Sequence, residues 1–121
     1  MALYDHTFIR IEMHTILSQK EKYMVIISNV TYPPESTREI ANRYLKAPVL
    51  PDFLNKKGPY VSASKTGGMN SITFYELDND RLAEGLKSIG ESLAIYFGVP
   101  GYKYDLKPYF ELEEGLSILG L

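Results

Sequence analysis

The chain has 121 residues, which is the length of one ordinary domain. Hydrophobic residues make up 45% of it, a normal share for a globular protein, and the formal net charge is only −2. No basic excess indicates a nucleic-acid-binding face, and the lack of cysteine excludes disulfides and thiol nucleophiles. We predict a single domain over residues 1–121, with a core at about 22–110 between an N-terminal extension (1–21) and a C-terminal tail (111–121).

The N-terminus carries no basic stretch followed by an apolar run, so no secretory signal is expected. No apolar run approaches the ~20 residues that a membrane-spanning helix needs. These features predict a cytoplasmic protein with neither a nucleic-acid nor a membrane partner.

The N-terminal extension is ambiguous over residues 8–17. Ile9, Ile11 and Met13 alternate with polar residues, which is typical of a half-exposed strand. Ile9, Met13 and Ile16 also fit one helical stripe. A strand is favoured because Ile11 falls off that helical face.

Residues 23–30 form the clearest predicted strand, and both of its faces are apolar. Tyr23, Val25 and Ile27 share one face, and Met24, Ile26 and Val30 share the other. A strand of this kind needs cover on both sides. Because two helices can cover only one side of a sheet, we expect a second copy of the chain to cover the other.

A helix is predicted next, at about 36–46, opened by a capping box of Ser36 and Glu39. Residues 52–58 are expected to be a connector. They lead into a predicted hairpin with arms at 59–65 and 70–77, joined by a loop that contains Gly67 and Gly68.

A second helix is predicted at about 79–97, capped by Asp78, Asn79 and Asp80. Its apolar residues keep the spacing of one buried stripe: Leu82, Leu86, Ile89, Leu93, Tyr96 and Phe97. Gly85 and Gly90 each cost a helix up to about 1 kcal/mol relative to alanine, which suggests that they let it lie close to the sheet.

The last core strand is predicted at 102–109, with Pro108 ending its pairing. Its charged residues Lys103, Asp105 and Lys107 indicate either the rim of a dimer or the edge of the sheet. The tail at 111–121 is predicted to be helical, with Leu112, Leu116 and Leu119 on one side.

The resulting order is βαββαβ, which resembles the ferredoxin-like fold: an α+β protein whose four-stranded antiparallel sheet has two helices on one face. The chain also resembles the dimeric α/β-barrel superfamily, closest to short members of uncharacterised function. The resemblance rests on Tyr23-Met24-Val25, on the strand that enters Pro108 and on Glu113-Glu114. It implies a homodimer built through open sheet faces, or a higher oligomer built from such dimers. Members of the superfamily range from cofactor-independent monooxygenases to ligand-sensing domains. This chain does not resemble the haem-degrading members, which share an Asn/Trp/His set, because it has no tryptophan.

Ten tyrosines are the most unusual feature of the composition. An aromatic cavity with a few hydroxyls suits a small apolar or aromatic ligand. The candidate pocket residues on predicted strands are Tyr60, Ser62, Ser64, Thr73, Tyr75 and Tyr104. The alternative is that tyrosine simply fits strands and interfaces.

No catalytic set can be assembled from the sequence, and no metal or cofactor is expected. His6 and His14 are too far apart for a standard metal-binding spacing, and Lys65-Thr66-Gly67-Gly68 suits a hairpin turn better than a phosphate loop. Three functions stay open. In order of preference they are a homodimeric small-molecule binding or sensing domain, a structural dimer without ligand, and a cofactor-independent monooxygenase-like or isomerase-like enzyme.

Overall fold

The computed structural model describes residues 23–121, so the strand predicted at 8–17 lies outside the described residues. This part of the chain contains four strands, three α-helices and two short 3₁₀ turns. They are β1 (Tyr23–Tyr32), η1 (Pro34–Ser36), α2 (Thr37–Tyr44), β2 (Asn55–Ser64), β3 (Gly68–Asp78), η2 (Asn79–Arg81), α3 (Leu82–Ala94), β4 (Lys103–Tyr109) and α4 (Leu112–Ile118).

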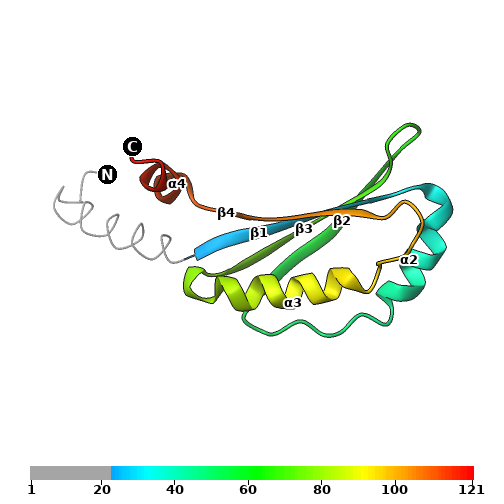
Figure 1. The fold of residues 1–121 in the computed structure, drawn as a ribbon, viewed down its shortest axis with the longest axis horizontal. Coiled ribbons are helices and arrows are strands. Elements are labelled where there is room, and N and C mark those ends of the chain that lie inside the picture. Colours follow the sequence, from blue (N-terminus) through cyan, green and yellow to red (C-terminus); the bar gives the residue numbers. More distant parts are fainter. Residues whose placement is uncertain (1–22) are drawn as a thin grey trace, which may run out of the picture.

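The four strands form one antiparallel sheet in the order β2-β3-β1-β4. Helices α2 and α3 lie on the same side of this sheet, and α4 lies beyond its end, next to the start of β1 (Figure 1). The predicted α+β class and the four-stranded antiparallel sheet are therefore confirmed.

The register decides which side chains share a face, because directly opposed residues of an antiparallel pair point the same way. Ile26 lies opposite Tyr75 and Ser28 opposite Thr73, all four on the side of the helices. We call this the helix-side face. The second face, which neither α2 nor α3 covers, is here called the open face, and its apolar residues include Tyr23, Val25, Ile27, Tyr60, Ile72 and Phe74.

The main core joins the helix-side face to α3. Met24, Ile26 and Leu77 from the sheet pack with Ile89 and Leu93 from the helix. A second cluster lies beside α2 and contains Tyr32, Ile40, Tyr96 and Val99. These buried positions follow the two periods of the sequence, two along the strands and about 3.6 along the helices.

The predicted capping box is wrong, because Ser36 makes a tertiary contact instead. It lies in the η1 turn, and its Oγ donates a hydrogen bond to the Pro100 carbonyl oxygen at 2.6 Å. Glu39 pairs with Arg43 one helical turn further on. Arg43 also donates to the carbonyl oxygens of Ile95 and Phe97 at 2.8 and 2.9 Å, just past the end of α3. A cation there is favourable, and it ties α2 to α3.

Strand β2 starts at Asn55, inside the segment predicted as a connector. Its pairing with β3 shifts register between Lys57 and Tyr60, and Gly58 has a φ of +106°. Such an irregularity interrupts the alternation of side chains, which hides the start of the strand in the sequence.

Strand β4 is an edge strand, the second of the two alternatives drawn from its alternating charges. Its pairing continues one residue past Pro108, with Tyr109 opposite Val25. Proline is tolerated there because an edge strand has one unpaired side. The predicted helical tail is present as α4, although Leu112 and Leu119 are exposed.

Candidate functional site

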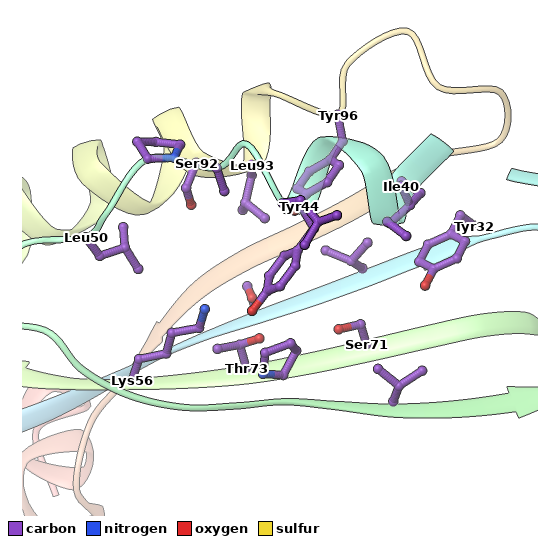
Figure 2. Close-up of a pocket in the computed structure, with 18 of the residues that line it drawn as sticks. Tyr32, Ile40, Tyr44, Leu50, Lys56, Ser71, Thr73, Ser92, Leu93 and Tyr96 are labelled. Carbon is purple, nitrogen blue, oxygen red and sulfur yellow. The ribbon is translucent and has the colours of Figure 1, made fainter. Parts of the chain in front are cut away.

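A cavity of about 830 Å³ lies between the helix-side face and the helices. Its floor comes from β1 and β3, its roof from α2 and the C-terminal part of α3, and its rim from residues 45–50 and the start of β2 (Figure 2). We call it the tyrosine pocket. The lining residues used below are Ser28, Tyr32, Ile40, Ala41, Tyr44, Lys56, Val61, Ser71, Thr73, Tyr75, Leu93 and Tyr96.

Four tyrosines from four elements meet around this pocket. Tyr44 reaches down from α2, and Tyr96 points towards the sheet from the turn after α3 (Figure 2). Tyr32 and Tyr75 come from β1 and β3. The side chain of Tyr75 is 4% exposed, with its ring in the main core.

The floor of the pocket is a cluster of buried hydroxyls. Ser28 and Thr73 lie opposite each other on β1 and β3 and are 2% and 5% exposed. Burial raises the pKa of Tyr75, while hydrogen bonds with Ser28 and Thr73 act in the opposite direction. These mutual contacts satisfy the buried polar groups, as a stable interior requires.

Tyr96 is the most strongly perturbed tyrosine of the pocket. Burial, and after it the neighbouring phenols of Tyr44, Tyr75 and Tyr32, raises its pKa to about 12. Within residues 23–121 the structure gives no hydrogen bond to the hydroxyls of Tyr44 and Tyr96. Both hydroxyls are therefore hydrogen-bonding sites that a ligand can use, and the raised pKa keeps that of Tyr96 protonated.

Lys56 is the only charged residue among those that line the pocket within the described chain. Its Nζ lies 5.5 Å from the centre of the Tyr44 ring, a cation–π distance. Figure 2 shows Lys56 extending from the start of β2 towards Tyr44. The neighbouring Lys57 points to the open face, where it pairs with Glu76.

The structure brings together two of the six candidate residues, Thr73 and Tyr75. Tyr60 and Ser62 lie opposite Ile72 and Asn70, which places them on the open face.

Two further candidates also lie outside the pocket. Ser64 accepts a hydrogen bond from the Gly67 backbone N–H in the hairpin turn. Tyr104 is half-exposed and stacks on Phe97 and Tyr102, with ring centres 5.7 and 5.9 Å away.

Sequence reasoning missed Ser28, Tyr44, Lys56 and Tyr96 as pocket residues. The available signal was the pair of tyrosines at 44 and 96, each on the apolar stripe of its helix. A tyrosine on such a stripe faces the sheet, and its hydroxyl then needs polar company. Small hydroxyl residues on the facing strands supply it.

No family model, curated protein or solved structure matches the chain. Within residues 23–121, no helix is both long enough and apolar enough to cross a bilayer. The same part of the chain holds no group of three or more His, Cys, Asp or Glu side chains arranged to bind a metal. Function is therefore inferred from the pocket.

Proposed function

We propose that the chain is a small-molecule binding domain whose ligand occupies the tyrosine pocket, and that it works as a homodimer. The observation that carries the proposal is the cavity itself, with the hydroxyls of Tyr44 and Tyr96 on its walls, which have no hydrogen-bond partner among residues 23–121. Its volume of about 830 Å³ falls in the range of sites that hold metabolite-sized ligands.

The composition of the lining supports binding over catalysis. None of the described lining residues is Asp, Glu, His or Cys, the usual bases and nucleophiles. The raised pKa values of Tyr75 and Tyr96 keep both phenols protonated, so they act as hydrogen-bond donors and not as bases. A monooxygenase-like or isomerase-like activity therefore finds less support than binding.

The homodimer is supported by the open face. Val25, Ile27, Ile72 and Phe74 form an apolar centre there, and Tyr60 packs edge-on against Phe74. Charges of both signs flank this centre: the Lys57–Glu76 pair on one side and Lys103, Asp105 and Lys107 on the other. A second copy turned by a two-fold axis can match such a mixed pattern.

The topology fits the same proposal. The βαββαβ order and the strand order β2-β3-β1-β4 support a ferredoxin-like arrangement. Two such sheets that pack open face to open face would resemble the dimeric α/β-barrel superfamily.

A thermal-shift screen with small aromatic and apolar compounds tests the binding function. A ligand at a hundred times its Kd stabilises the folded state by about 2.7 kcal/mol, which is measurable as a rise in Tm. Hits should perturb the NMR signals of the Tyr96 and Thr73 backbone amides. A broad library without a single hit would overturn the proposal.

Two alanine variants locate the binding site. Ala41 lines the pocket and is exposed on α2, so Ala41→Phe should fill the cavity and abolish binding without disturbing the core. Ala94 is also exposed, on α3, but does not line the pocket. Ala94→Phe is the matched control and should bind normally; equal binding by both variants would place the ligand elsewhere.

A further inference from the structure

The charge balance of the tyrosine pocket points to the class of its ligand. Lys56 contributes the only formal charge among the described lining residues, and no carboxylate lies among them. The four salt bridges within residues 23–121 all involve other side chains, so Lys56 has no acidic partner there. Its neighbour Lys57, on the opposite face of β2, is paired with Glu76. The pocket therefore has an uncompensated positive charge at its rim.

The rest of the lining is apolar and aromatic. Ile40, Leu93 and the rings of Tyr44 and Tyr96 surround the space above the hydroxyl floor (Figure 2). Such walls favour a flat, ring-bearing ligand, and the hydroxyls of Tyr44 and Tyr96 add hydrogen-bonding sites. A cationic ligand is disfavoured, because the Lys56 ammonium already lies over the Tyr44 ring.

The number of cations limits the charge of the ligand. The two arginines of α2, Arg38 and Arg43, do not line the pocket, and Arg43 is engaged with Glu39 and with carbonyl oxygens beyond α3. The single ammonium group of Lys56 compensates the one negative charge of a carboxylate. A phosphate dianion would retain a second negative charge with no cation in the pocket to compensate it.

We infer that the pocket selects aromatic monocarboxylates, with the carboxylate bound by Lys56 at the rim and the ring held between Tyr44 and Tyr96. This inference rests on the proposed binding function and adds its selectivity. The same chemistry describes an apolar chain that ends in a carboxylate, so an aliphatic acid is a necessary comparison.

Isothermal titration calorimetry of the full chain tests the inference with naphthoate, its neutral amide naphthamide, naphthyl phosphate and decanoate. Naphthoate should bind about tenfold more tightly than naphthamide, the difference expected of one charge-assisted hydrogen bond. It should also bind more tightly than naphthyl phosphate and decanoate. Added salt should weaken the binding of naphthoate and leave the affinity for naphthamide unchanged.

Lysine variants connect this preference to the pocket. Lys56→Met should lower the affinity for naphthoate to that for naphthamide. Lys56→Arg should keep the tighter binding of naphthoate. Lys87, exposed on α3 and outside the pocket, supplies the control variant Lys87→Met, which should behave like the wild type.

The outcomes separate the two proposals. Equal binding of naphthoate and naphthamide, or a preference that survives in Lys56→Met, overturns the anion selectivity and leaves the binding function standing. If decanoate binds more tightly than naphthoate, the preference for an aromatic ligand is overturned. If naphthyl phosphate binds more tightly than naphthoate, the preference for a single negative charge is overturned. If none of the four compounds binds but the thermal-shift screen gives hits that Ala41→Phe abolishes, the selectivity fails and the binding function stands; if the screen gives no hit either, both fail.

Discussion

The phenol of Tyr96 couples the tyrosine pocket to the pH of the solution. Its side chain is 9% exposed, and burial raises its pKa from 10.0 to about 12. The folded state therefore holds the proton more tightly than the unfolded chain does. The stability from this difference is fully present below pH 10 and is lost as the pH rises through about 12.

We predict that Tyr96→Phe reduces the alkaline loss of stability. The Tm of the wild type should fall between pH 10 and about 12. The Tm of the variant should fall by less, because a group with a raised pKa has been removed. The loss will not vanish, since burial also raises the pKa of Tyr75 and Tyr102. Calorimetry at a series of alkaline pH values measures the effect.

Tyr23→Phe is the matched control for this prediction. Tyr23 is 52% exposed at the start of β1 and does not line the tyrosine pocket, so Tyr23→Phe shows the effect of losing a phenol from outside the pocket. Identical profiles for wild type and Tyr96→Phe would show that this phenol does not resist ionisation in the folded state.

At the scale of single elements, α3 contains two glycines in very different surroundings. A Cβ at Gly85 would lie 2.6 Å from Cδ1 of Leu77 and 3.4 Å from Cδ1 of Ile26, both in the core. A Cβ at Gly90 would meet nothing within 4 Å. Close approach to the sheet therefore explains the first glycine, as the sequence suggested, but not the second.

The two alanine substitutions should change stability in opposite directions. Gly90→Ala should raise the free energy of unfolding by up to about 1 kcal/mol, the helix-propensity difference. Gly85→Ala gains the same term but overpacks the core, which typically costs about 1–3 kcal/mol, so a net loss is expected. Urea unfolding measures both, and stabilisation by Gly85→Ala would contradict the close packing of α3 on β3.

The sequence predicted those elements whose period is uninterrupted. The apolar run Tyr23–Val30 and the helical stripe from Leu82 to Leu93 correspond to β1 and α3 in the structure. The start of β2 was missed because the register shift after Lys57 breaks the alternation. The predicted capping role of Ser36 was wrong, because its hydroxyl donates to the carbonyl oxygen of Pro100, 64 residues away, and does not cap the helix.

The candidate site was predictable only in part, for a related reason. Thr73 and Tyr75 are two residues apart on β3, so they point to the same face of the sheet in any regular strand. Their proximity can therefore be predicted from the local sequence. Tyr44 and Tyr96 reach the same space only because Arg43 and the packing of two helices bring them over the sheet. Such contacts depend on the tertiary fold, which no pattern within a single element encodes.

At the scale of the whole molecule, the proposed dimer can be tested at the open face. Tyr60 and Val61 are neighbours on β2, are 57% and 55% exposed, and point to opposite faces of the sheet. Tyr60→Glu should break the dimer, because it places a charge in the apolar interface. Val61→Glu, on the helix side, should leave the dimer intact.

Light scattering at micromolar concentration gives the oligomeric state of all three proteins. The wild type and Val61→Glu should be dimers and Tyr60→Glu a folded monomer, with circular dichroism confirming the fold. A monomeric wild type would refute the homodimer, and a dimer that tolerates Tyr60→Glu would move its interface away from the open face.

The two border strands restrict how this sheet can meet another. Strand β4 carries three charged residues and a proline: Lys103, Asp105, Lys107 and Pro108. On the other border, β2 carries Lys56, Lys57 and Pro59 next to its register shift. Charges, prolines and bulges are the devices that keep the free main-chain groups of a border strand from pairing with a foreign strand. Fibril-like growth through added strands is thereby obstructed at both borders, which agrees with the proposal that copies of the chain associate through their open faces.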